Sequence, residues 1–129
     1  MRGCCGCRWR GVWERFERYI HNVNMLASVI TDNLEGIADL CRKYNVRQLE
    51  VFGSAATGKY TDKSDVDFLV EFPEYDIENP PSDYLDNYFL LLSGLEDLTG
   101  RQVDIVTKRF IKNPIFKRII QREAILIYG

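Results

Sequence analysis

The chain has 129 residues, of which 46% are hydrophobic, so its length and composition predict one globular domain with a single core. Its longest apolar run, "YFLLLSGL", is far shorter than the roughly 20 residues that cross a bilayer, which argues against a membrane protein. Residues 1–24 hold five arginines and two glutamates, whereas residues 25–129 hold 12 basic and 17 acidic residues. The acidic balance of the longer part disfavours generic nucleic-acid binding.

Residues 1–24 allow two interpretations. Apolar side chains at helical spacing predict a short amphipathic helix that docks on the domain or on a partner; these are Trp9, Trp13, Phe16 and Ile20. Alternatively, the segment is an upstream extension outside the native domain, which then spans residues 25–129. We favour the extension, because the composition changes abruptly at Met25.

Three of the four cysteines crowd the same segment, at Cys4, Cys5 and Cys7. No second ligand pair follows at metal-site spacing, and His21 is the only histidine, so a zinc site is not expected. The segment has no apolar central run, so a signal peptide is not expected either. Because no disulfide pattern spreads over the core, we expect a cytoplasmic protein.

From residue 26 to residue 44, apolar residues recur at helical intervals, which predicts the first helix of the domain. Two strands follow, "QLEVF" at 48–52 and "VDFLVEF" at 66–72, and the second ends at a proline-rich loop over 73–82. The link between the strands is short. An antiparallel pair is therefore expected, and a doubly wound sheet is not.

Ser82 is a candidate N-cap for a helix that runs to about Thr99 and stops at Gly100. The side chains expected to face inward from this helix are Leu85, Phe89, Leu92 and Leu95.

The C-terminal part predicts a third strand, "QVDIV" at 102–106, and a fourth, "AILIY" at 124–128. Between them, Asn113 and Pro114 start a helix that ends near Arg122. The order of elements predicts a mixed α/β domain with a sheet flanked by helices.

The link between the first two strands has the composition of a binding loop. Gly53 and Ser54 follow the first strand directly, and such a pair can turn a hydroxyl and successive N–H groups toward one anion. Gly-Ser is also a common turn dipeptide, so the pair alone is a weak signal.

Asp65 and Asp67 stand two residues apart at the start of the second strand, so both carboxylates face the same side, about 6–7 Å apart along the backbone. Two anions on one face repel each other unless a cation lies between them, and oxygen-rich acidic sites suit Mg²⁺. The alternative is a solvated strand end.

Asp104 interrupts the third strand, where strand propensity disfavours aspartate. A neighbouring position in the sheet would place it beside the pair. If buried, it would be costly without a metal. The alternative is an exposed face on an edge strand.

Together, Gly53-Ser54, ten intervening residues, Asp65-Val66-Asp67 and the later Asp104 resemble the minimal nucleotidyltransferase (MNT) family of the DNA polymerase β superfamily. The resemblance covers most of residues 26–129 and implies a polymerase β-like fold and a nucleotidyltransferase that uses ATP and two Mg²⁺ ions. It implies that Asp65 and Asp67 hold both ions and that Asp104 binds the catalytic one and helps to deprotonate the acceptor.

The resemblance also implies that Gly53 and Ser54 hold the β and γ phosphates. Many members read G-S-x-A-R-G where this chain reads "GSAATG", so Thr57 replaces an arginine and removes a positive charge near the triphosphate. Lys59 and Lys63 are candidates to compensate for that charge, although each is also an ordinary solvated loop lysine.

Residues for a second, acceptor-binding domain are lacking, so we expect a partner or a second subunit to present the acceptor. The family implies a HEPN-domain toxin, encoded by the neighbouring gene, as partner, with AMP moved from ATP to a tyrosine of that toxin, as in a type VII-like toxin–antitoxin system. Two alternatives stay open: a small-molecule nucleotidyltransferase of the aminoglycoside kind, which predicts a dimer with an acidic cleft at "PEYDIE", and a non-catalytic antitoxin that acts by binding alone.

Overall fold

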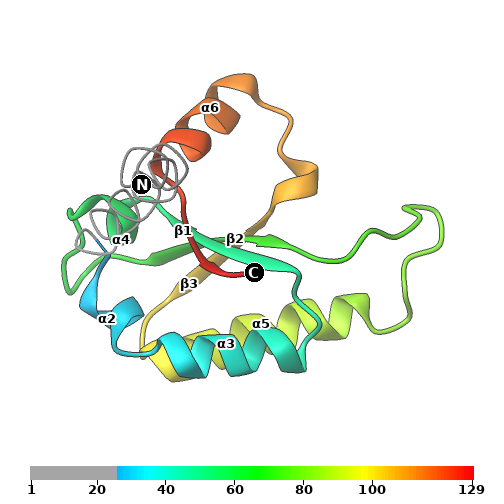
Figure 1. The fold of residues 1–129 in the computed structure, drawn as a ribbon, viewed down its shortest axis with the longest axis horizontal. Helices are drawn as coiled ribbons and strands as arrows, with labels where there is room; N and C mark the ends of the chain where they lie inside the picture. The colour runs from blue at the N-terminus through cyan, green and yellow to red at the C-terminus, as the bar shows by residue number, and fades with distance from the viewer. Residues whose placement is uncertain (1–25) are drawn as a thin grey trace, which may run out of the picture.

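The computed structural model describes residues 26–129, which form one mixed four-stranded sheet with helices on both faces (Figure 1). The strand order is β3-β2-β1-β4. The strands are β1 (Gln48–Phe52), β2 (Val66–Glu71), β3 (Val103–Thr107) and β4 (Ile125–Tyr128). Strand β1 pairs antiparallel with β2 and β4, whereas β2 and β3 are parallel. The predicted antiparallel pair and the mixed α/β class are confirmed.

The main core lies between one face of the sheet and two helices, α3 (Leu34–Lys43) and α5 (Tyr84–Thr99), which run side by side (Figure 1). Strand side chains that alternate inward, such as Leu49, Phe68 and Val70, are fully buried there. Cys41 of α3 is also fully buried, and burial raises its thiol pKa to about 12. This cysteine therefore remains a protonated core residue.

The opposite face of the sheet carries a smaller apolar cluster. Phe52, Leu69 and Ile120 are its buried members, and Ile120 belongs to α6 (Pro114–Glu123), which covers part of this face. Two short elements complete the fold, α4 (Ser54–Thr57) directly after β1 and η1 (Lys108–Phe110) directly after β3. Neither was predicted, because one turn of helix is too short to show a period.

The predicted helix over residues 26–44 is divided. A short helix α2 (Ser28–Thr31) ends at Thr31, and α3 begins after Asn33. The Asn33 side chain donates to the Val29 carbonyl oxygen, 2.7 Å away, and thereby replaces a backbone bond of a continuous helix. The apolar period continued across the break, so periodicity alone could not show it.

Helix α5 differs from its prediction at its start and in its buried face. Asp83 rather than Ser82 precedes the first helical residue, and its side chain makes no capping hydrogen bond. Leu85 and Phe89, expected inside, are 63% and 60% exposed, and Leu91 and Leu95 are the fully buried residues. The helix is apolar on both sides, so its period could not identify the inner one.

No helix within residues 26–129 is long and apolar enough to cross a membrane. The predictions about residues 1–24, including the docking helix and the three crowded cysteines, lie outside the described residues.

Candidate active site

The turn after β1 has a backbone shape that only glycine adopts readily. Gly53 has φ +72° and ψ −150°, a region essentially reserved for glycine, and it leads directly into α4. A Cβ atom at this position would lie 2.6 Å from Oδ2 of Asp67. The carboxylate of β2 thus lies against the glycine backbone, and the two halves of the sequence motif meet in space.

Three carboxylates gather at this end of the sheet. Asp67 and Asp104 occupy paired positions on the parallel strands β2 and β3, and Asp65 immediately precedes β2. Burial raises the pKa of Asp67, and the negative charges of Asp104 and Asp65 raise it further. The residues predicted to cooperate are therefore close enough to repel one another.

Asp104 is exposed, whereas its neighbours Val103 and Ile105, which face the other side of the edge strand β3, are buried. Asp104 is therefore not a buried carboxylate that needs a metal, contrary to the prediction. Asp104 belongs to the site because it pairs in register with Asp67 on the neighbouring strand. Both side chains therefore lie on the face of the sheet that carries Leu69 and Val106.

The donor set suits a divalent cation that also binds a nucleotide. Within residues 26–129, no group of three or more His, Cys, Asp or Glu side chains is arranged to hold a metal ion by itself. Mg²⁺ usually keeps several waters and takes only one or two protein carboxylates, with substrate phosphates completing its shell. One or two of Asp65, Asp67 and Asp104 would supply the protein side of such a shell, with substrate phosphates as the rest.

Thr57 has a structural role in the loop. Its hydroxyl donates to the Gly53 carbonyl oxygen at 3.0 Å, and the Ala56 N–H donates to the same oxygen at 3.0 Å. These two bonds fix the turn that Gly53 begins. Ser54 is half-buried, and its hydroxyl makes no hydrogen bond to another residue of the described part.

Lys59 and Lys63, the predicted compensating charges, are both exposed in the loop between α4 and β2. No side-chain contact of either lysine within residues 26–129 ties it to Gly53 or to the acids. Compensation for the missing arginine charge by either lysine stays a prediction.

Arg101 is a cation at this end of the sheet that no sequence pattern indicated. Its guanidinium donates to the Asp62 carbonyl oxygen and lies 5.8 Å from the centre of the Tyr60 ring. It therefore holds the loop that leads to Asp65 against the start of β3. A polar residue just before a strand carries no pattern that would have revealed this contact.

Comparisons with known proteins identify the family of the chain. The chain matches the nucleotidyltransferase domain family over residues 35–127. A relative from Methanocaldococcus jannaschii, named as a protein adenylyltransferase, is 44% identical over 88 residues, which are 68% of this chain and 83% of that protein. The protein adenylyltransferase MntA of Thermococcus cleftensis is 37% identical over 89 residues, 69% of this chain and 82% of the relative.

Among solved structures, a minimal nucleotidyltransferase aligns with a TM-score of 0.60 and 33% identity, over 74% of this chain and 90% of that one. A toxin–antitoxin structure with AMP-PNP aligns at 0.58 with 20% identity, over 75% and 73% of the two chains. The complex of tri-AMPylated Shewanella oneidensis HEPN toxin with MNT antitoxin aligns at 0.51 with 18% identity, over 77% and 71%. The last two share the fold.

The chain therefore belongs to the nucleotidyltransferase domain family and is a nucleotidyltransferase of the minimal type. The resemblance inferred from Gly53-Ser54 and the aspartates is confirmed at the level of family, fold and enzyme class.

Proposed function

We propose that this nucleotidyltransferase moves AMP from ATP to a tyrosine hydroxyl of a HEPN-domain toxin and thereby acts as its antitoxin in the cytoplasm. The observation that carries the proposal is the convergence of Gly53 with Asp67 and of Asp67 with Asp104 at one end of the sheet. Further support comes from relatives named as protein adenylyltransferases and from the fold shared with an MNT antitoxin bound to a HEPN toxin.

In the proposed reaction, Gly53 and Ser54 bind the β and γ phosphates, since the bare glycine backbone permits close approach. Asp65 and Asp67 would hold two Mg²⁺ ions, and Asp104 would share the catalytic one. When bound, these ions neutralise the triphosphate and stabilise an in-line displacement at the α-phosphorus.

The acceptor oxygen forms a bond to the α-phosphorus while the bond to pyrophosphate breaks. A tyrosine hydroxyl has an ordinary pKa of about 10, so it needs help to lose its proton. The exposed carboxylate of Asp104 is available to accept that proton, and no histidine occurs within residues 26–129 to do so.

The aminoglycoside alternative is less well supported. It requires an acidic acceptor cleft near residues 73–78. The cleft beside Tyr75 holds Glu71 and Glu74, but three cations line it as well: Lys108, Arg109 and Lys117. A cationic substrate would find little net attraction there. The binding-only alternative does not explain why three carboxylates that repel one another lie together.

The test mixes the full chain with ATP, Mg²⁺ and the product of the neighbouring gene, and measures AMP on tyrosines of that product by mass spectrometry. We expect an adduct that falls at least about a hundredfold in Asp65→Asn and Asp67→Asn. Asp62→Asn is the matched control, because Asp62 is an exposed acid of the same loop, and this variant should transfer AMP normally.

Three results would redirect the assignment. Toxin inhibition that survives both aspartate substitutions without an adduct supports binding alone. Transfer to an aminoglycoside with an unmodified partner supports the small-molecule enzyme. Equal loss of transfer in Asp62→Asn would show that the aspartate effects are not specific to the site.

A further inference from the structure

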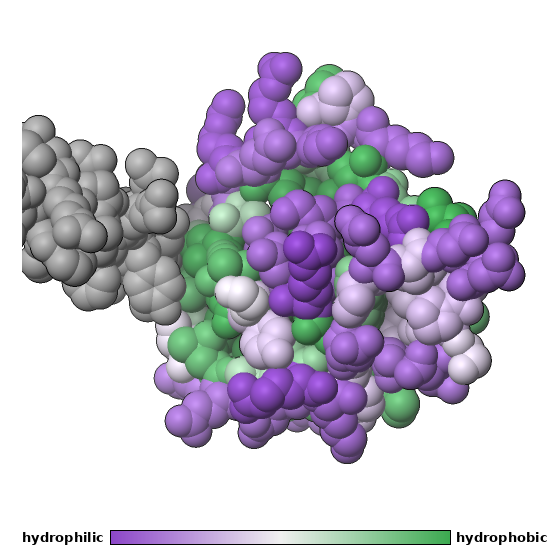
Figure 2. Space-filling view, turned by 45° about the vertical axis from the view of Figure 1, so that its right-hand side comes forward, coloured by the Kyte–Doolittle hydropathy of each residue, from purple (hydrophilic) through white to green (hydrophobic). Residues whose placement is uncertain are grey.

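Exposed apolar side chains concentrate beside the edge strand β3. Eight large hydrophobic side chains are exposed in the described part of the chain, and three of them, Leu85, Phe89 and Phe110, line one groove. Apolar side chains also reach the surface between rows of hydrophilic ones in Figure 2. Helix α5 is apolar on its outer side as well as its inner side, a pattern typical of a helix that is covered on both.

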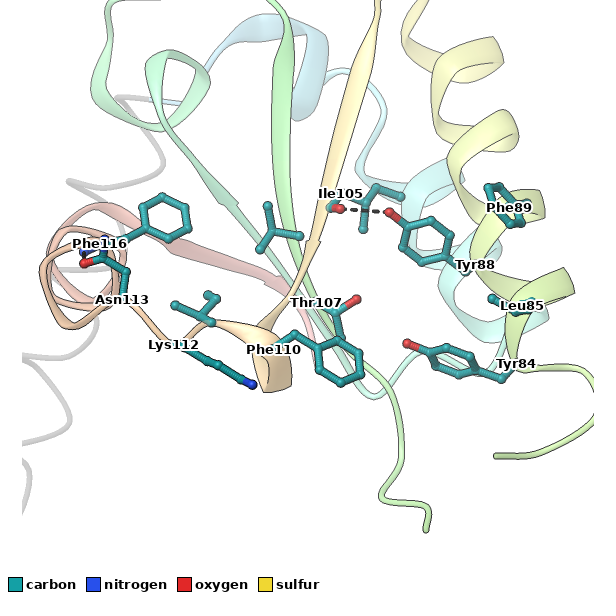
Figure 3. A pocket seen from close by; sticks show the side chains of 12 residues that line it. Tyr84, Leu85, Tyr88, Phe89, Ile105, Thr107, Phe110, Lys112, Asn113 and Phe116 are labelled. Atoms are coloured by element: carbon teal, nitrogen blue, oxygen red, sulfur yellow. Dashed lines mark hydrogen bonds between the residues drawn. The ribbon is translucent and has the colours of Figure 1, made fainter. Parts of the chain in front are cut away.

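The groove is wide enough for several side chains. Its volume is about 520 Å³, and it lies between α5 on one side and η1 with the start of α6 on the other. Figure 3 shows Tyr84 and Tyr88 reaching from α5 toward β3, with Phe110 at the mouth and Phe116 on the far wall. The wall and mouth are therefore largely aromatic.

At the floor of the groove, one outward backbone group of the edge strand is already bonded. The Tyr88 hydroxyl donates to the Ile105 carbonyl oxygen at 2.9 Å, so this outward group of the edge strand already has a partner (Figure 3). Strand addition relies on such free backbone groups. A helix instead inserts side chains from one face and leaves the edge untouched, so the groove favours a helix.

The groove begins beside the proposed active site. Ile105 and Val106, which line it, follow Asp104 directly on β3. Val106 is two strand residues, about 6–7 Å, from Asp104 and on the same face, so a side chain seated against Val106 lies within reach of Asp104. An acceptor carried by that segment, or next to it, would be delivered to the carboxylate proposed to take its proton.

The charge at the groove is positive on one side. Lys112 lines the groove and forms no ion pair within residues 26–129, and Lys108 and Arg109 precede it in η1. Lys108 lies 4.0 Å from Glu50, and Arg109 stacks over Tyr75 at 4.5 Å. Lys112 is thus the cation most available to an acid on the occupant.

We propose that the groove between α5 and η1 docks an amphipathic helix of the acceptor protein, with an apolar face against Leu85, Phe89 and Phe110 and an acidic flank beside Lys112. This proposal rests on the proposed function, because it takes the occupant to be the protein that receives AMP.

Calorimetric titration of the full chain with the neighbouring gene's product tests the docking. We expect Phe89→Asp to weaken the Kd at least tenfold. Lys112→Glu should weaken it by a smaller factor and flatten its dependence on salt. Ile77→Asp is the matched control, because Ile77 is 61% exposed, as is Phe89 at 60%, and lies outside the groove. Its Kd should stay within twofold of wild type.

AMP transfer separates this inference from the proposed function. Docking through the groove predicts that Phe89→Asp raises KM for the partner and leaves kcat and ATP affinity near wild type.

If the partner binds in a way that depends on Phe89 but the wild-type chain transfers no AMP, the docking proposal stands and the proposed function is overturned. Wild-type Kd and KM in Phe89→Asp would overturn the docking, as would absence of binding by the wild-type chain. A wild-type dimer that Phe89→Asp converts to a monomer, with partner affinity unchanged, would also overturn it.

Discussion

Gly53 is the residue on which the geometry of the site depends most. Its backbone lies in a glycine-only region, and a methyl group there would meet the Asp67 carboxylate at 2.6 Å. We expect Gly53→Ala to displace that carboxylate, to cost about 1–3 kcal/mol of unfolding free energy and to abolish most AMP transfer. Thermal unfolding and mass-spectrometric transfer assays measure the two effects.

Gly100 provides the comparison. It also has a positive φ, +67°, but a Cβ atom there would have nothing within 4 Å. Gly100→Ala should therefore cost about 1 kcal/mol through backbone strain alone and leave transfer unchanged. If both variants lose the same stability and keep the same activity, the contact between Gly53 and Asp67 has no functional role.

The ionised carboxylate of Asp67 lowers the free energy of unfolding. Its folded-state pKa is raised above the ordinary value of 3.8, so its ionised form disfavours the folded state. Below about pH 3.8 the group is protonated in both states and has no effect on stability. As pH rises through the folded pKa, the group ionises in the crowded site, and unfolding free energy is lost.

Asp67→Asn removes this penalty at neutral pH. Without Mg²⁺ or nucleotide, we expect the variant to be more stable than wild type at pH 7, by a few tenths of a kcal/mol or roughly 1–3 °C in Tm. The difference should shrink as pH falls toward 4. A variant that is less stable than wild type at pH 7, or a difference that does not change with pH, would contradict the crowding of carboxylates.

At the scale of elements, helix α6 is fixed by its first residues. Oδ1 of Asn113 accepts from the N–H groups of Ile115 at 2.9 Å and Phe116 at 3.3 Å, and Pro114 occupies the first turn. Asn113→Ala should cost about 1 kcal/mol in urea unfolding. Asp83→Ala, at the N-cap of α5 where no capping bond forms, should cost much less. Equal costs would show that the bonds to Asn113 contribute nothing.

Strands were easier to predict than helix faces. "QLEVF" was predicted within its observed bounds, and the other three strands within one residue, because short apolar runs between turn signals define strands well. The inner face of α5 could not be predicted, since Leu85 and Phe89 continue the apolar pattern that Leu91 and Leu95 complete. If a partner covers the outer side of α5, the helix packs into two apolar interfaces. One is the core of this chain, and the other is the interface with the partner.

The site was predictable in composition but not in arrangement. A two-residue period placed Asp65 and Asp67 on one side of a strand from sequence alone. Which strand lies beside β2, and in which register, depends on packing of the whole domain, so the pairing of Asp67 with Asp104 had to come from the structure. The same holds for Arg101, which contacts a loop 39 residues away in sequence.

At the scale of the whole molecule, we expect the domain to need residues from Leu26 onward and none before Met25. Leu26 and Ala27 are buried, and the Ala27 N–H donates to the Ala55 carbonyl oxygen at 2.9 Å, which ties the start of the domain to α4. A chain that begins at Met25 should keep the Tm and AMP transfer of the full chain. A chain that begins at Asn33 loses fully buried Ile30 and should be destabilised by roughly 2–5 kcal/mol.

If the chain that begins at Met25 loses transfer while its Tm is unchanged, residues 1–24 take part in function, and the interpretation of this segment as an extension is wrong.

The most direct test of nucleotidyl transfer follows the phosphorus atoms of ATP. Parallel reactions contain the full chain, Mg²⁺, the neighbouring gene's product, and ATP labelled at either the α- or the γ-phosphate. We predict that α-label enters the partner protein in wild type and not in Asp67→Asn, and that pyrophosphate is the only reaction product that carries γ-label. Label from the γ-phosphate on the partner, or α-label that still enters it in Asp67→Asn, would contradict the account.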